Sequence, residues 1–341
     1  DFAEIRKRGA ETDVGMTTEV ALMAILLVGV LAGRGSTALA TVVGGATALL
    51  LHLKTRLHEF AGRLDDQDIK AIMQFALVSL VILPVLPDRT FGPYDVINPR
   101  QVWWMVVLIV GLSLAGYVAY RLLGARVGTL AGGLLGGLIS STATTVSYAR
   151  RSGSSTGADR LAALAILLAS TVLMARVVVE LAVVVPAQLS QLVWPLAISG
   201  AVGLAMAASI WRRSGGGEIE GPETKNPSEL KTALVFAALY VVVLLLATAA
   251  QRRFGDRGLY VVAVLSGLTD MDAITLSTAR MLEQSDVTAG QTWRVILIAA
   301  TSNLAFKAGV VAVLGSRGLL WRILVTFGII AAANLLLVWL W

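Results

Sequence analysis

Long apolar segments separated by short polar ones recur along the whole chain. A helix of roughly 18 residues or more can cross a hydrocarbon layer of about 30 Å, so each such segment predicts a membrane-spanning helix. The pattern therefore predicts an all-α, polytopic membrane protein of about eleven spans. These cover residues 15–33, 36–53, 69–87, 101–122, 127–149, 161–184, 190–211, 230–250, 258–280, 293–315 and 318–341.

Two polar interruptions divide these spans into three blocks. Residues 84–99 contain four prolines and predict a stiff exposed connector, and residues 212–229 predict a flexible linker. Leu53, Leu57, Phe60 and Leu64 have helical spacing opposite charged residues, which predicts an amphipathic helix between the second and third spans. The predicted blocks are an N-terminal three-span block and two repeat units, residues 1–87, 98–211 and 226–341.

The two repeat units rest on an internal sequence match. GGLISSTATTVSYAR (136–150) aligns with SGLTDMDAITLSTAR (266–280) without a gap, with seven identities in fifteen positions. At a similar offset, Arg176 aligns with Lys307. Four spans per unit would give two parallel copies, whereas a motif segment that forms a re-entrant hairpin would give inverted copies. The sequence leaves both arrangements open.

Composition agrees with a membrane protein and excludes several classes of site. The 341 residues are 56% hydrophobic and 15% charged, with a mean hydropathy of +0.77. With no cysteine and two isolated histidines, disulfides, thiolate metal sites, zinc and haem are not expected. The net charge of +6 lies in short loops, where it fits lipid headgroups better than nucleic acid. No nucleophile and base pair or ATP motif suggests an enzyme.

Asp270 and Asp272 lie near the middle of an otherwise apolar span. An ionised carboxylate there costs several kcal/mol unless it meets a partner, an ion or water. Because two residues correspond to about 200° around a helix, both cannot face one way on a regular helix. Either one pairs elsewhere, or the helix opens near residues 267–269 and its backbone joins the site.

An open helix with two carboxylates and neighbouring hydroxyls is an all-oxygen environment, which suits hard cations such as Mg²⁺, Ca²⁺, Mn²⁺ or Na⁺. The equivalent positions of the first copy, Ser140 and Thr142, are neutral. The predicted cation ligands are Asp270 and Asp272, with Thr269, Thr275, Ser140, Ser141, Thr142 and Thr144 as supporting oxygens.

Two basic residues inside spans are candidate partners. Lys307, with Asn303 one turn before it, is predicted to pair with Asp270 or Asp272 as a gate, although the same pair could be purely structural. Arg176 has an i,i+4 partner in Glu180. The glycines of AGGLLGGL (131–138) predict close helix packing, with a backbone-lined pathway as the alternative.

Several stretches resemble the bacterial MgtC/SapB family, in its long form with a C-terminal domain of unknown function 4010. They include TTEVA (17–21), the segments at 74–100 and 116–145, and SGLTDMDAITLS (266–277). The resemblance implies a protein of the bacterial inner membrane and a link to Mg²⁺ limitation, without naming the transported species. The family's N-terminal helices with their Gly, Glu and Arg signature are largely absent. Since the chain begins at Asp1 with a polar segment, we expect something upstream.

The leading hypothesis is a transporter or channel for a small inorganic cation, with a divalent metal such as Mg²⁺ as the expected ion. Bound cation apart, no cofactor is expected, and the partners are the ion, the lipid bilayer and, on small-residue faces, a second copy in a homodimer. One alternative is a non-transporting regulatory or assembly protein whose buried ion pair is structural. Another is a small-anion transporter that uses Arg176 and Lys307.

Overall fold

The computed structural model is all-helical and describes residues 16–54, 66–123, 129–152, 157–212 and 230–340. It forms two compact units, residues 1–65 and 66–341. The first contains α2 (Met16–Gly33) and α3 (Thr37–His52), which pack against each other, with Val28 beside Gly44. The amphipathic helix predicted around residues 53–64 lies mostly outside the described residues.

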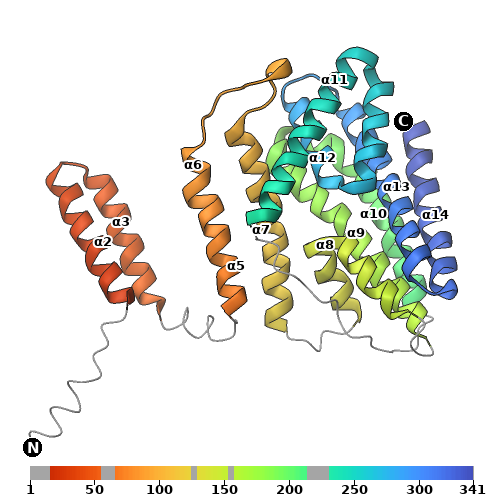
Figure 1. The fold of residues 1–341 in the computed structure, drawn as a ribbon, viewed down its shortest axis with the longest axis horizontal. Helices are drawn as coiled ribbons and strands as arrows, with labels where there is room; N and C mark the ends of the chain where they lie inside the picture. Colours follow the sequence, from red (N-terminus) through yellow and green to blue (C-terminus); the bar gives the residue numbers. More distant parts are fainter. Residues whose placement is uncertain (1–15, 55–65, 124–128, 153–156, 213–229, 341) are drawn as a thin grey trace, which may run out of the picture. The chain divides into compact units, whose positions relative to one another are not determined.

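The second unit contains the remaining helices, which Figure 1 shows as a bundle. It begins with α5 (Asp66–Ala76), a π-helical segment η1 (Leu77–Ile82) and α6 (Leu83–Val85), followed by the short η2 (Pro93–Asp95). α5, η1 and α6, predicted as part of the N-terminal block, pack against α7: the Trp103 indole donates to the Val78 carbonyl at 2.8 Å. The other elements are α7 (Pro99–Leu123), α8 (Thr129–Arg151), α9 (Ala158–Val184), η3 (Pro186–Gln188), α10 (Leu189–Trp211), α11 (Leu230–Thr269), α12 (Met271–Glu283), α13 (Ala289–Leu314) and α14 (Arg317–Leu340).

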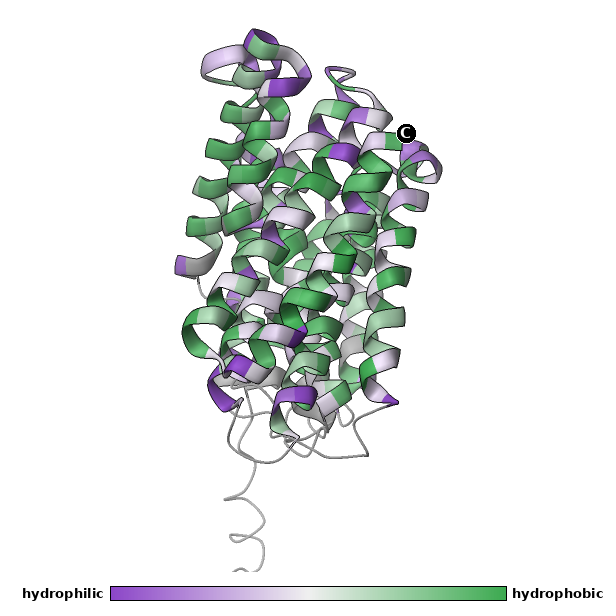
Figure 2. Cartoon of the chain, turned by 90° about the vertical axis from the view of Figure 1, so that its right-hand side faces the viewer, coloured by the Kyte–Doolittle hydropathy of each residue, from purple (hydrophilic) through white to green (hydrophobic). Residues whose placement is uncertain are grey.

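Six of the described helices are long and apolar enough to cross a membrane, which indicates a multi-pass membrane protein. Hydrophobic residues make up most of the helices drawn in Figure 2, and hydrophilic ones gather toward the two ends of the bundle. The six segments are Pro99–Ala119, Ala158–Val184, Pro186–Trp211, Ala233–Leu268, Ala289–Leu314 and Arg317–Leu340. Three of the predicted spans, at 15–33, 36–53 and 69–87, correspond to shorter apolar helices.

The predicted spans at 127–149 and 258–280 are wrong, because each folds back on itself. In α8 the backbone is extended at Ser140, and a Cβ placed on Gly133 or Gly137 would lie 2.9 and 2.6 Å from the Cα atoms of Ala165 and Ala169. The two contacts advance together, so residues 129–139 run parallel to the start of α9. After Ser140 the chain must return to enter α9. We call residues 129–151 the first hairpin.

The second hairpin, residues 256–283, has the same form. Its first arm starts after Gly255, whose φ of 58° suits glycine, and Asp256 accepts a hydrogen bond from Gln291 near the start of α13. Further along, a Cβ on Gly267 would lie 2.8 Å from the Cα of Ala299. This arm therefore runs parallel to α13, and α12 returns to the start of α13.

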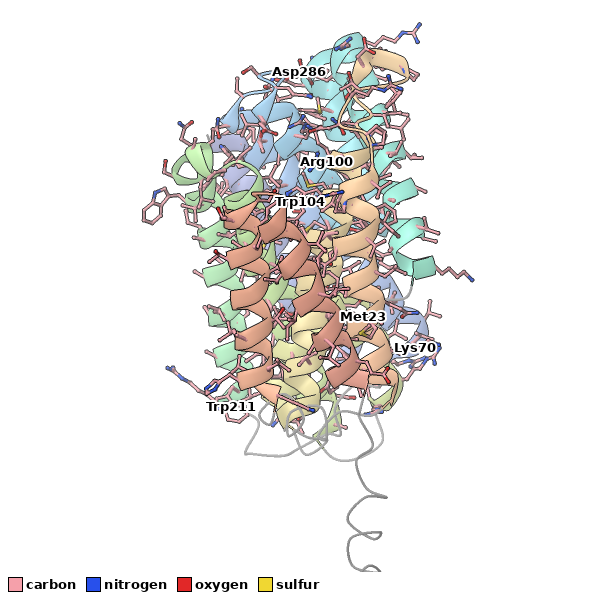
Figure 3. The ribbon with its side chains drawn as sticks, turned by 90° about the vertical axis from the view of Figure 1, so that its left-hand side faces the viewer. Met23, Lys70, Arg100, Trp104, Trp211 and Asp286 are labelled. Atoms are coloured by element: carbon pink, nitrogen blue, oxygen red, sulfur yellow. The ribbon has the colours of Figure 1, made fainter. Side chains whose placement is uncertain are left out.

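The two hairpins enter the bundle from opposite ends (Figure 1). The second lies at the start of α13, a helix about 39 Å long at 1.5 Å per residue. The end of α13 leads to Ser316, whose N–H donates to the Ser152 hydroxyl at the end of the first hairpin, at 2.8 Å. Figure 3 places Asp286, beside the second hairpin, and Trp211, at the end of α10, at opposite ends of the unit.

Each repeat unit therefore has three long helices and one hairpin instead of four spans. An odd number of crossings turns the second copy upside down relative to the first, which is the inverted arrangement. The first arm of the first hairpin has 11 residues and is about 16 Å long. This is about half the thickness of a hydrocarbon layer. The first arm of the second hairpin, residues 256–269, is longer, at about 21 Å.

Candidate functional site

Asp270 forms the tip of the second hairpin. Its backbone is extended, with φ of −151° and ψ of 127°, between the end of α11 and the start of α12. The side chain caps α12: Oδ1 accepts from the backbone N–H of Asp272 at 2.7 Å and of Ala273 at 3.3 Å. The predicted opening of the helix is therefore confirmed, one residue beyond the predicted stretch at 267–269.

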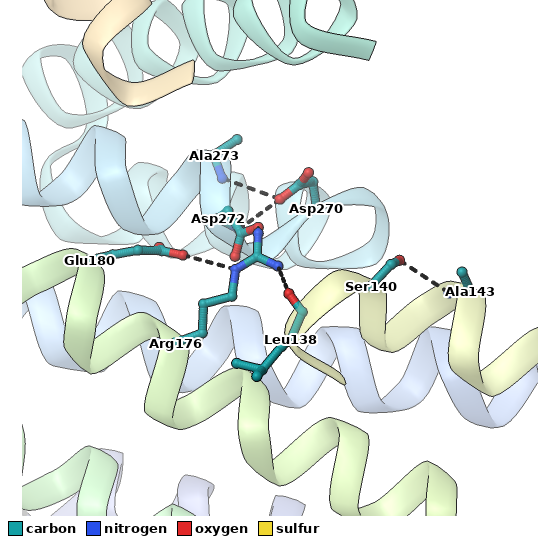
Figure 4. Close-up of polar contacts among 8 residues, drawn as sticks. All are labelled: Leu138, Ser140, Ala143, Arg176, Glu180, Asp270, Asp272 and Ala273. Carbon is teal, nitrogen blue, oxygen red and sulfur yellow. Dashed lines mark hydrogen bonds and ion pairs between the residues drawn. The ribbon is translucent and has the colours of Figure 1, made fainter. Parts of the chain in front are cut away.

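Ser140 occupies the same place in the first hairpin. Its hydroxyl accepts from the backbone N–H of Ala143 at 3.2 Å, the contact that aligns with Asp270 and Ala273 (Figure 4). Serine and aspartate are both strong helix caps. The two tips therefore share one local structure and differ in charge.

Arg176 on α9 connects the two tips. Its Nη2 donates to Oδ2 of Asp272 in the first turn of α12, and its Nη1 donates to the Leu138 carbonyl of the first hairpin at 3.2 Å (Figure 4). Nε donates to Glu180 at 3.3 Å, so the predicted i,i+4 partner is confirmed. All four residues lie inside the bundle, where Arg176 is 5% exposed.

Lys307 does not occupy the place that the sequence predicted. Its ammonium donates to the Ser170 hydroxyl at 3.2 Å, and among the described residues the ion pair with Asp272 is made by Arg176. Lys307 is fully buried and lines a separate cavity of about 20 Å³, large enough for about one water. Asn303, one turn earlier, lies between the two sites: it lines both cavities and donates to the Gly267 carbonyl at 3.0 Å.

The two tips border a cavity of about 280 Å³. Its apolar walls include Ile109 and Phe236, from α7 and α11. Its polar side chains come from both hairpins and from α7, α9 and α13. They are Ser113, Ser140, Ser141, Thr142, Arg176, Asp270, Asp272 and Asn303.

Some oxygen acceptors at this site have no hydrogen-bond partner. Oδ1 of Asp272, Oδ1 of Asn303 and Oε2 of Glu180 are buried, and none of the described residues donates to them. Two of these three residues line the cavity itself. An unsatisfied buried acceptor is costly, so these oxygens favour a positively charged or hydrogen-bond-donating occupant.

Two of the remaining predicted ligands, Thr144 and Thr275, do not line this cavity. Thr144 is buried and its hydroxyl donates to the Ser140 carbonyl at 2.8 Å. Thr275 is fully buried and its hydroxyl has no hydrogen-bond partner among the described residues. The side chain of Thr269 lies outside the described part of the structure.

The geometry differs from a closed metal cage. Within the described residues, no three His, Cys, Asp or Glu side chains are grouped to hold a metal ion. Two freed carbonyls at the tips, of Leu138 and Gly267, already accept from Arg176 and Asn303. A cation would therefore meet one or two carboxylates together with water, as hydrated Mg²⁺ does in proteins.

The sequence did not predict Ser113 as part of the site, and it indicated Glu180 only as a partner of Arg176. Ser113 is a single hydroxyl within apolar α7, and nothing in its own helix separates it from an ordinary buried serine. Glu180 faces the same guanidinium as Asp272, which becomes evident only when α9 and α12 are packed together.

Comparisons with known proteins give a family without a known activity. Residues 107–315 match the family described as Domain of unknown function (DUF4010). An uncharacterized protein of Aquifex aeolicus (strain VF5) is 31% identical over 188 residues, which is 54% of this chain and 82% of that protein. No solved structure matches. The matched range contains both hairpins, α9 and α13.

Proposed function

We propose that this chain, which belongs to the DUF4010 family, carries a small inorganic cation across a membrane by way of the cavity between its two hairpins. The observation that carries the proposal is the charge around this cavity. Asp270 and Asp272 supply two carboxylates to its wall, and Arg176 supplies one positive charge next to them. Glu180 does not line the cavity, but it adds a third carboxylate against the same guanidinium. Lys307 lies beyond Asn303, in its separate cavity.

An excess of carboxylates in a low-dielectric interior has to be offset by bound cations or by protons. Asp272 presents Oδ1 without a hydrogen-bond partner, and Asp270 borders the same cavity. A cation from solution would offset the excess negative charge of the carboxylates, and it would also coordinate Oδ1 of Asp272.

The arrangement of the hairpins supports movement of this ion. They enter from opposite ends and meet near the middle of the bundle, and in transporters inverted repeats place substrate sites at the bilayer midplane. Movement of one repeat unit against the other would expose the cavity first to one side of the membrane and then to the other. This reasoning rests on the architecture and is independent of the charge argument.

The cavity volume is compatible with a hydrated divalent ion. At about 30 Å³ per water, 280 Å³ holds about nine water molecules, more than the six around Mg²⁺. Mg²⁺ is therefore the first ion to test, with Mn²⁺, Ca²⁺, Co²⁺ and Na⁺ beside it. The resemblance to the MgtC/SapB family points to the same ion and to the bacterial inner membrane, and both belong to this proposal.

One observation favours a small anion as the second candidate. The first residues of two half-helices, Ser141 and Thr142 in the first hairpin and Met271 and Asp272 in the second, line the cavity. Helix N-termini attract anions, and Arg176 stands beside them. The two carboxylates on the same wall oppose an anion, which is why we place it second.

The test compares Asp270→Asn with wild type in proteoliposomes and by isothermal titration with the five cations. Because Asn caps helices as well as Asp does, the variant removes charge and preserves the start of α12. Saturable cation binding and uptake by wild type, lost in the variant, would support the proposal. Asp286→Asn, on an exposed loop, is the matched control. The proposal would be contradicted if Asp270→Asn took up cations as fast as wild type does. It would also be contradicted if wild type took up none of the five cations.

A further inference from the structure

Arg176, on α9, forms hydrogen bonds to both hairpins and to Glu180 of its own helix. Nη1 contacts the Leu138 carbonyl, Nη2 contacts Asp272, and Nε contacts Glu180 of its own helix. Leu138 and Asp272 belong to opposite repeat units. The guanidinium thus stands where the two units meet.

The carboxylate of Asp272 is divided between Arg176 and the cavity. Oδ2 accepts from the guanidinium, whereas Oδ1 has no hydrogen-bond partner and its residue lines the cavity wall. A cation bound at Oδ1 would approach the guanidinium closely. Two unit charges about 5 Å apart, at an effective dielectric constant of about 20, oppose binding by roughly a few hundredfold, and a divalent cation is opposed more strongly. A bound cation and the Arg176 ion pair therefore compete.

The second repeat lacks this arrangement. Lys307, which aligns with Arg176, donates to Ser170, and the Gly267 carbonyl, one residue before the position that aligns with Leu138, accepts from the neutral Asn303. Among the described residues, Arg176 is therefore paired with a tip carboxylate, Asp272, whereas its counterpart Lys307 is not. The arrangement is specific to Asp272 and does not follow from the repeat.

We propose that Arg176 is a resident cation, which neutralises Asp272 when no ion is bound and gives way when the transported cation arrives. This inference rests on the cation transport proposed above and describes the regulation of that same site. An ion-free carrier with an unpaired buried carboxylate would be strongly disfavoured. With Arg176 in place the empty carrier can change its orientation, so net uptake proceeds without a returning ion.

The experiment separates net uptake from exchange in proteoliposomes. Net uptake is measured into vesicles without Mg²⁺, and exchange is measured with an isotope of Mg²⁺ when the ion is present on both sides. Arg176→Gln should keep exchange and lose at least about tenfold in net uptake, because only its empty form is impaired. It should also bind Mg²⁺ at least about tenfold more tightly, as competition is removed.

Two further variants test whether the effect of Arg176→Gln comes from the loss of charge at this position. Arg176→Lys preserves the charge but lacks the planar fork that reaches Leu138, Asp272 and Glu180 together, so it should retain more net uptake than Arg176→Gln and bind Mg²⁺ more tightly than wild type. Arg100→Gln removes a half-exposed surface arginine near Asp88 and should behave as wild type. If Arg176→Gln does not fold, Mg²⁺ affinity of Arg176→Lys decides.

The outcomes distinguish the two proposals. Wild type that neither accumulates nor exchanges any of the five cations contradicts cation transport itself. Wild type that does both, with a folded Arg176→Gln whose exchange and net uptake fall together or stay unchanged, overturns the resident-cation role alone. Weaker or unchanged Mg²⁺ binding in Arg176→Lys also overturns it.

Discussion

Replacing Asp270 by Asn and by Ala separates its two roles. The carboxylate caps α12 through hydrogen bonds to the N–H groups of Asp272 and Ala273, at 2.7 and 3.3 Å, and it also supplies negative charge to the cavity. Asn retains the cap and removes the charge. Ala removes both.

The expected magnitudes follow from these contacts. Loss of an N-cap costs about 1 kcal/mol, within a range of about 0.5–2, so Asp270→Ala should be less stable than Asp270→Asn by this amount. For a cation about 4 Å away, the lost attraction is about 4 kcal/mol at an effective dielectric constant of about 20. Both variants should therefore lose cation binding to a similar extent.

The assay combines thermal unfolding in detergent with isothermal titration of Mg²⁺. We expect the melting temperature to fall further in Asp270→Ala than in Asp270→Asn, and binding to be lost in both. If Asp270→Asn binds Mg²⁺ as wild type does and only the Ala variant fails, the residue acts as a cap alone. Equal melting temperatures in the two variants would refute the capping argument.

Two further predictions concern packing and buried charge. Gly267→Ala should lower the melting temperature, at a cost of about 1–3 kcal/mol, because the new Cβ would lie 2.8 Å from the Cα of Ala299. Gly309→Ala, in the same bundle with no atom within 4 Å of its Cβ, should be neutral or stabilising, and an equal loss in both would contradict close hairpin packing. Lys307→Met should keep or raise the melting temperature, since it replaces a fully buried amine whose hydrogen bond is to the Ser170 hydroxyl by an apolar chain of similar length, and a strong destabilisation would show that the amine is needed for folding.

The sequence contained enough information for the polar centre of the fold. Asp270 and Asp272 stand out because charge is rare within apolar segments, and their two-residue spacing leaves two alternatives, a partner on another face or an opening of the helix. The glycines of the first hairpin were assigned to packing, and Gly133 and Gly137 do lie against the backbone of α9. These features are local, so they can be read along one chain segment.

The path of each motif segment could not be read in this way. A hydropathy window records how apolar a segment is and contains no information on whether the chain crosses or turns back. The reversal at Ser140 and Asp270 becomes visible only through contacts with α9 and α13. For the same reason Lys307 was chosen as the partner of Asp272, although Arg176, 96 residues away in sequence, makes that contact.

The unlike tips of the two hairpins have a consequence for the direction of the molecule. In a carrier built from two identical inverted halves, a two-fold rotation would exchange the form open to one side with the form open to the other, and their free energies would be equal. Here Ser140 and Thr142 face Asp270 and Asp272, and Arg176 has Lys307 as its unlike counterpart. In the carrier proposed above, the two forms would therefore differ in free energy, and these side chains would set its preferred resting side.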